Sequence, residues 1–318
     1  MTTTSGVRTA AMLTLNVTNG ACTDHVLHPD GPFSLAAARG SVRDWPPLSR
    51  FAAGPEDDRP DAPLVLATIA DDDLAPVAFA VSQEHADGPV EVAIVGTGDP
   101  DRALAQIARI LSLDHSGAGL TDVAGRDPAV GAVLARHPGR RPVLFGSPYE
   151  AAAWGVISTR MRVRQAVTLV RRLAAEHGTR LEVAGRTVDA FPTPEALLAL
   201  DEIPGLPGEK VRRLHAVARA ALDGDLDAAR LRALGPVGAR AAVCRIRGIG
   251  GFWASLIWLR ACGVVDEWPD EPRATAALAR LHGRDPAGFP DAGTLAEATA
   301  PLAPYRTWIA FLLRITGA

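Results

Sequence analysis

The sequence contains little cysteine and no long apolar run. Its three cysteines, Cys22, Cys244 and Cys262, are too few and too widely spaced for a zinc site, an iron–sulfur cluster or a disulfide framework. We therefore predict three buried thiols and no catalytic metal. No apolar stretch reaches the roughly 18 residues that a membrane-spanning helix requires, which argues against a membrane protein.

The amino-terminal segment also lacks the features of an export signal. MTTTSGVRTAAMLTLNV has neither a charged start nor a long apolar stretch, so we expect a cytoplasmic protein. A hydrophobic fraction of 47% over 318 residues indicates a folded chain with two or three packed units.

Lysine is almost absent, and the charges are unevenly distributed. Lys210 is the only lysine among 33 basic residues, and the net charge is −3. Residues 1–146 hold 11 basic and 18 acidic side chains, whereas residues 147–318 hold 22 basic and 18 acidic ones. The second part is therefore the better candidate for contact with phosphates, although an arginine-rich composition can also reflect coding bias.

The first 146 residues have the pattern of a mixed domain. Four segments show the alternation or β-branched richness of strands, and two show helical spacing. The strands are predicted in MLTLNV (12–17), APLVLATIA (62–70), APVAFAVSQ (75–83) and VEVAIVG (90–96), and the helices in residues 33–45 and 101–113. We predict an α+β domain with an antiparallel sheet over residues 1–146.

Residues 147–318 change to helices that glycine and proline interrupt, which predicts an all-helical second domain. Apolar residues recur with helical spacing over 150–178, with a break near Ser158–Met161. Thr193-Pro194-Glu195 has the capping residue, first-turn proline and acidic residue of a helix start.

Two glycine-containing turns interrupt these helices. In Arg247-Gly248-Ile249-Gly250-Gly251 the glycines allow positive φ and leave backbone N–H groups bare at the start of the next helix, where an anion can bind. Residues 203–208, IPGLPG, precede Glu209 and Lys210 and are either a degenerate copy of this turn or a proline-stiffened connection.

The order of these features resembles the DNA-3-methyladenine glycosylase II group of the helix-hairpin-helix DNA glycosylase superfamily. The similarity covers nearly the whole chain, and its most specific parts are the hairpin RGIGGFWA and the carboxylates that follow it. The matching stretches are LSLDHSGAGL (111–120), HPGRRPVLFGSPYEAAAWGVIS (137–158), RGIGGFWA (247–254), WPDEP (268–272) and APYRTWIAFLLR (303–314).

The resemblance implies base flipping on double-stranded DNA that carries a damaged base. It places Arg160 at the position of the side chain that fills the gap left by the flipped nucleotide, although relatives have a glutamine-rich run there. Bifunctional members carry a lysine where this chain has Phe252, so we expect hydrolysis without a lyase step. The other side chains or backbone groups that we assign to DNA are Arg247, Gly248, Ile249, Gly250, Gly251 and Lys210.

The family's carboxylate corresponds to Glu271, and Asp270 lies one residue earlier. Such a group stabilises positive charge on the sugar or activates water. Alternatively, both are carboxylates that the helix dipole favours at a helix start before Pro272.

Aromatic side chains are the expected surface for a cationic alkylated base. Trp253, Trp268 and Tyr149 are our candidates for the base pocket, although a tryptophan in a helical pattern is more often part of the core. The resemblance implies no organic cofactor, but it allows a monovalent cation on the carbonyl groups of Gly248–Gly250.

The sequence is compatible with two functions. One is a monomeric, monofunctional glycosylase for alkylated bases that acts in base excision repair at the nucleoid. The other is a DNA-damage-binding protein of the same fold with weak or no catalysis, as the displaced carboxylate suggests. The sequence does not specify which base is removed.

Overall fold

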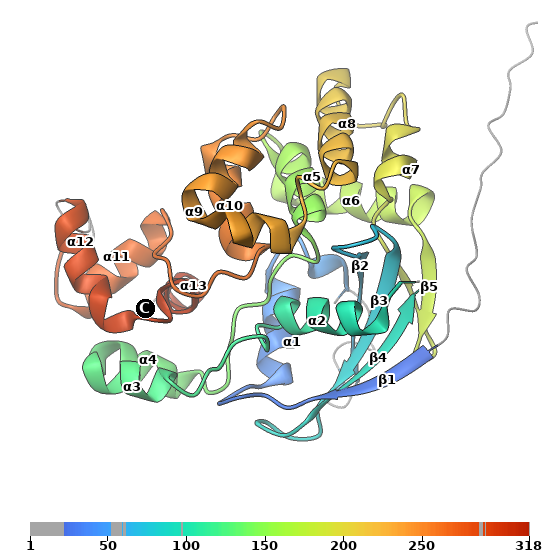
Figure 1. The fold of residues 1–318 in the computed structure, drawn as a ribbon. Coiled ribbons are helices and arrows are strands. Elements are labelled where there is room, and N and C mark those ends of the chain that lie inside the picture. Colours follow the sequence, from blue (N-terminus) through green and yellow to red (C-terminus); the bar gives the residue numbers. More distant parts are fainter. Residues whose placement is uncertain are drawn as a thin grey trace, which may run out of the picture.

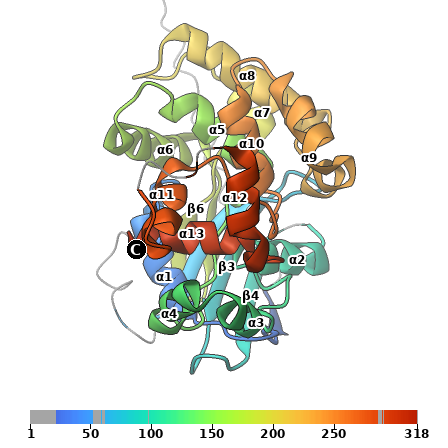
Figure 2. The ribbon, with the colours of Figure 1, turned by 90° about the vertical axis from the view of Figure 1, so that its left-hand side faces the viewer.

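The computed structural model describes residues 22–51, 59, 62–96, 98–285, 289 and 291–317 (Figure 1). The strand that we predicted in residues 12–17 lies outside the described residues. Within them, an antiparallel sheet lies at one end of the molecule and helices α5–α10 lie beside it (Figures 1 and 2).

Four antiparallel strands form the sheet in the order β1-β4-β3-β2: β1 (Cys22–Leu27), β4 (Val90–Gly96), β3 (Pro76–Ser82) and β2 (Leu64–Ile69). Three of them match predicted strands, while β1 was not predicted. All six residues of β2 are buried, because both of its faces are covered. The remaining elements here are α1 (Leu35–Asp44), η1 (Ser49–Phe51) and α2 (Pro100–Ile110).

The described residues of the second part are helical with one exception, which corrects the prediction of an all-helical domain. Its helices are α5 (Pro148–Ser158), α6 (Val163–His177), α7 (Pro194–Leu198), α8 (Gly208–Leu222), α9 (Ala228–Cys244), α10 (Gly251–Arg260), α11 (Pro272–Leu281), α12 (Ala292–Thr299), η3 (Ala300–Leu302) and α13 (Arg306–Thr316). The exception is a hairpin of β5 (Arg180–Val183) and β6 (Arg186–Asp189), whose alternation in LEVAGRTVD we had not interpreted as strands. The hairpin contacts strands β2, β3 and β4, so it extends the packing of the first domain.

Two helices of the amino-terminal half pack against the carboxyl-terminal helices. α3 (Leu120–Arg126) and α4 (Pro128–Arg136) lie beside α11 and α13 in both views (Figures 1 and 2). They share one hydrophobic core, and Arg126 donates to the carbonyl oxygen of Pro301 at 2.9 Å. The packing therefore crosses the predicted boundary at residue 146. The buried members of this core are Val123, Val130, Val133, Ala277, Leu278, Leu302, Tyr305, Trp308, Ile309, Leu312 and Leu313.

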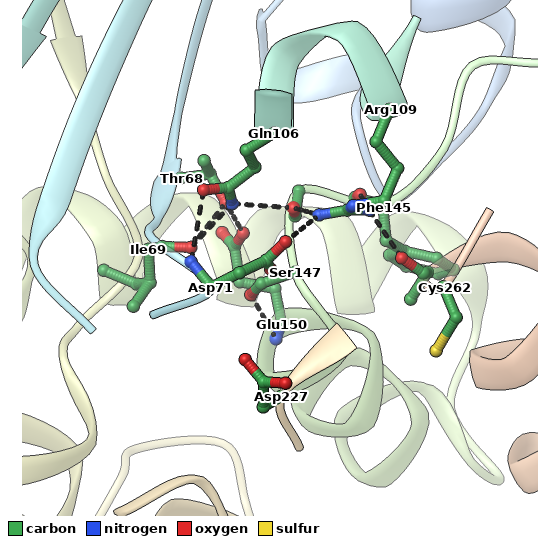
Figure 3. Close-up of polar contacts among 12 residues, drawn as sticks. Thr68, Ile69, Asp71, Gln106, Arg109, Phe145, Ser147, Glu150, Asp227 and Cys262 are labelled. Atoms are coloured by element: carbon green, nitrogen blue, oxygen red, sulfur yellow. Dashed lines mark hydrogen bonds and ion pairs between the residues drawn. The ribbon is translucent and has the colours of Figure 1, made fainter. Parts of the chain in front are cut away.

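The connection between the two halves, residues 141–147, is buried without regular structure, and arginines bind its carbonyl groups. Arg109 donates to the oxygens of Phe145 at 3.3 Å and Gly146 at 2.7 Å (Figure 3). Arg260, the last residue of α10, donates to the oxygen of Val143 at 2.6 Å. Burial lowers the pKa of Arg260 to about 9. Buried carbonyl groups need such partners, so the arginines fix the path of the connection.

A second polar group joins α5 to the sheet. Glu150, in the first turn of α5, accepts a hydrogen bond from Thr68 of β2 (Figure 3). Its other oxygen pairs with Arg50 at 3.2 Å. Burial raises the pKa of Glu150, and Arg50 opposes that shift. The start of α5 is therefore tied to the sheet.

The prediction of three buried thiols was wrong for two of them. Cys262 is buried, but Cys22 and Cys244 are exposed. None of the described helices is long and apolar enough to cross a membrane. Among the described residues, no group of three or more His, Cys, Asp or Glu side chains is arranged to hold a metal ion.

Candidate active site and nucleic-acid interface

The turn between α9 and α10 leaves the start of α10 open. Gly248 has φ +98°, and the buried side chains of Ile246 and Ile249 anchor the turn to the core. Gly250 is the N-cap of α10, no side chain caps it, and the first turn contains no acidic residue. A Cβ added at Gly250 or Gly251 would meet no atom within 4 Å. The N–H groups at this helix end are thus available to an anion that approaches closely.

The earlier turn, before α8, is occupied by the protein's own charges. Glu209 in the first turn of α8 binds Arg212 at 2.8 Å, Arg213 at 3.0 Å and Arg247 at 3.2 Å. Hydrogen bonds from Arg212 and Arg213 lower the pKa of Glu209. Because Arg247 belongs to the second turn, Glu209 links the two turns.

A groove of about 440 Å³ lies between α8 and the second turn. Four arginines and one histidine contribute to its walls, together with Asp223 and Asp225 near the end of α8. The basic residues are Arg212, His215, Arg219, Arg245 and Arg247.

Lys210, which we had assigned to DNA, points into the molecule. Its Nζ donates to the carbonyl oxygens of Ile157 and Thr159, each at 2.7 Å. Both oxygens belong to the carboxyl-terminal end of α5.

Arg160 follows directly in the turn between α5 and α6, where the sequence predicted a break. It has φ +54° and an exposed side chain, which makes no hydrogen bond or ion pair with any residue that the structure describes. Its guanidinium is therefore free to contact a ligand.

The two candidate carboxylates lie at the start of α11. Asp270 is exposed, and its side chain has no partner among the described residues. Glu271 is the N-cap of α11: one oxygen accepts from the N–H of Arg273 at 3.2 Å, and the other pairs with Nε of Arg314 at 2.8 Å. Glu271 thus caps the helix, and Arg314 of α13 orients its second oxygen.

Sequence reasoning missed Glu267 and Arg314. Glu267 accepts from Nε1 of Trp258 at 2.9 Å and pairs with Arg240, so α9 and α10 hold the segment before α11. Thr307 of α13 donates to the carbonyl oxygen of Glu267 at 2.7 Å. The sequence contains no local signal for these pairs, because their members are far apart along the chain.

The three candidate pocket aromatics lie in different surroundings. Trp253 is half-buried against the larger core, whereas Trp268 packs against the core shared by α3, α4, α11 and α13. Tyr149 is buried, and its hydroxyl donates to the carbonyl oxygen of Pro192 at 3.0 Å, so it packs in the core here. Phe252, by contrast, is 66% exposed at the start of α10 and meets the ring of Trp253 edge-on. This exposed ring is an aromatic surface that we had not assigned to the pocket.

Comparisons with solved structures place this fold among DNA glycosylases. The 3-methyladenine DNA-glycosylase from Archaeoglobus fulgidus superimposes with a TM-score of 0.67 at 18% identity, over 92% of this chain and 98% of that one. The 8-oxoguanine glycosylase/lyase of Clostridium acetobutylicum superimposes with a TM-score of 0.54 at 16% identity, over 78% and 87% of the two chains. The chain therefore shares the α+β fold of these two DNA glycosylases, which confirms the predicted fold class.

Sequence comparison agrees with the fold. No protein-family model matches the chain. The probable bifunctional transcriptional activator/DNA repair enzyme AlkA of Mycobacterium tuberculosis is 27% identical over 177 residues, which are 52% of this chain and 34% of that protein. The match therefore spans about a third of the length of these curated relatives.

Proposed function

We propose that this protein is a monofunctional DNA glycosylase that hydrolyses the N-glycosidic bond of alkylated bases in duplex DNA. The observation that carries the proposal is the open start of α10, with its bare N–H groups at Gly250 and Gly251, in a fold that matches a 3-methyladenine DNA-glycosylase over 92% of the chain. A phosphate of the damaged strand would bind there.

The remaining steps of the proposed reaction use other residues of the chain. Arg160 enters the gap that the flipped nucleotide leaves, where its planar guanidinium stacks and contacts phosphates. The base rests against exposed aromatic surface that includes Phe252, with Trp253 behind it. A monovalent cation on the carbonyl groups of Gly248–Gly250 would add positive charge near the same phosphate.

Glu271 is the carboxylate in this proposal. As the bond between the sugar and the base breaks, the base leaves with the electron pair and positive charge develops on the sugar. An ionised Glu271 stabilises that charge and accepts the proton of the water that adds to the sugar. The ion pair with Arg314 orients the second oxygen of Glu271. Because Phe252 stands where a lyase has its lysine, the product is an abasic site.

Release of free base from alkylated duplex DNA by the purified protein tests this function. Glu271→Gln should lower the single-turnover rate by about a hundredfold or more, as loss of an electrostatic stabiliser does. The neighbouring Asp270→Asn is the matched control and should retain release. DNA affinity should persist in both variants, since neither residue belongs to the turn between α9 and α10.

Two results would contradict the proposal in different ways. Binding of damaged DNA by the unaltered protein without release of base would make it a damage-binding protein. Release that survives Glu271→Gln but not Asp270→Asn would keep the enzyme and move the carboxylate by one residue.

A further inference from the structure

The turn that carries Arg160 is held in place by two other elements. α5 ends at Ser158, Thr159 is its C-cap, and Arg160 has the left-handed backbone conformation. Met161 then turns its side chain back onto the core, and its N–H donates to the oxygen of Ser158 at 3.0 Å. The exposed Arg160 therefore stands between two anchored neighbours.

Lys210 is the anchor from α8. A helix end leaves carbonyl groups without intrahelical partners, and a cation there is favourable to the helix dipole. Two of the three Nζ protons of Lys210 bind such groups, those of Ile157 and Thr159. Burial and the nearby Arg213 lower the pKa of this ammonium group, as expected for a cation that faces the interior.

Trp253 is the anchor from α10. Its Nε1 donates to Oγ1 of Thr159 at 3.2 Å, and Thr159 Oγ1 donates to the oxygen of Gly155 at 2.6 Å. The indole lies against Gly155 so closely that a Cβ there would be 2.8 Å from the ring. Since Trp253 is in the first turn of α10, this contact connects the Arg160 turn to the helix start that is open to phosphate.

We propose that Lys210 is a positioning residue. It holds the carboxyl-terminal end of α5 so that Arg160 projects toward the DNA at a fixed distance from the start of α10, where the phosphate would bind. Lys210 does not itself bind a phosphate. This inference rests on the proposed function, because it assigns a task to the element that would enter the DNA.

The test compares Lys210→Met, which keeps the length of the side chain and removes its donors, with Arg160→Ala. Each variant should lower the single-turnover rate of base release by roughly tenfold, because misplacement of a reacting assembly by about 1 Å has effects of this size or larger. The double variant should show no further loss, since both changes disable the same element. Lys210→Arg should restore the rate, because a guanidinium can donate to both carbonyl groups.

Salt dependence separates positioning from direct contact. The measurement uses undamaged duplex DNA, in which no nucleotide is flipped and Arg160 has no gap to enter. Loss of a direct phosphate contact there reduces the slope of log affinity against log salt by about 0.9, whereas loss of a residue that only positions Arg160 leaves the slope unchanged. Arg171→Met, which removes one exposed positive charge from α6, is the control for charge alone and should release base at the original rate. Thermal melting checks the fold, and Lys210→Leu, which also has no donor, replaces the methionine variant if that variant does not fold.

The outcomes are distinct. A reduced salt slope in Lys210→Met, or losses that multiply in the double variant, would overturn the positioning role and leave the glycosylase proposal intact. Unchanged release in Arg160→Ala would reject both the role of Arg160 in the gap and the role of Lys210 in positioning it. No release by the unaltered protein would reject the proposed function itself.

Discussion

The turns before α8 and α10 share a backbone plan but differ in what occupies the helix start. Each contains a glycine with positive φ, Gly205 at +90° and Gly248 at +98°, and each leads into a helix without a side-chain cap. The first three helical residues are Gly-Glu-Lys in α8 and Gly-Phe-Trp in α10.

This difference decides which helix start is open. In α8, Glu209 supplies the negative charge that the helix dipole favours and gathers three arginines, while Lys210 turns inward. In α10 the second residue is the uncharged Phe252, so an external anion can occupy the same place. One turn therefore binds charges of the protein itself, and the other leaves its helix start open to an external anion.

A carboxylate placed at the start of α10 would break the comparison. Phe252→Glu reproduces the position of Glu209 and puts a negative charge where a phosphate would bind. We expect a loss of DNA affinity of about tenfold to a hundredfold at low salt, because like charges a few ångströms apart repel by several kcal/mol before screening. Phe252→Gln controls for loss of the ring, and fluorescence anisotropy measures both. Equal losses in the two variants would show that the ring matters and the charge does not.

Adding a methyl group to each turn compares their backbones. Alanine at a positive-φ position costs about 1 to 2 kcal/mol, so both Gly205→Ala and Gly248→Ala should lower the urea midpoint. Gly248→Ala should cost more stability, since its Cβ would lie 2.7 Å from Cδ of Arg213. A Cβ at Gly205 would lie 3.8 Å from its nearest neighbour, a side-chain atom of Arg172. Equal losses at the two glycines would mean that Arg213 moves aside freely, and a larger loss at Gly205 would contradict the comparison.

Removing the carboxylate of α8 should make the two turns more alike. Glu209→Gln releases Arg212 and Arg247, which line the groove beside the turn between α9 and α10. We therefore expect DNA affinity to rise a few-fold with a steeper salt dependence.

The same variant should change the response to acid. The pKa of Glu209 is lowered in the folded protein, so its stabilising effect is present above the pKa of the unfolded state and is lost as pH falls through the pKa of the folded state. The glutamine variant should therefore lose less stability than the unaltered protein between neutral and acidic pH. Equal acid sensitivity would contradict this assignment.

Much of the fold follows from local signals. Thr193 caps α7 with Pro194 and Glu195 in its first turn, as predicted, and Pro272 opens α11. The predicted break after Ser158 separates α5 from α6. The glycines of residues 247–251 form the connection to α10. Each of these features depends on neighbouring residues only, which is why the sequence is sufficient.

The positions of several charged side chains did not follow from the sequence. In an arginine-rich chain, Arg109, Arg141 and Arg260 look like surface residues, yet each is buried and donates to carbonyl groups. The pairing of Glu271 with Arg314 likewise joins positions that only the packing of α11 on α13 brings together. Such contacts depend on tertiary structure, which residue spacing does not encode.

The shared core of α3, α4, α11 and α13 has a consequence for how the chain matures. During synthesis, α3 and α4 emerge long before the helices that cover them, and contacts so distant along the chain close slowly. Until α13 leaves the ribosome, Val123, Val130 and Val133 lack their partners on the carboxyl-terminal helices, which leaves apolar surface open to chaperones or to aggregation. Helices made much later therefore complete a core that the first half of the chain began.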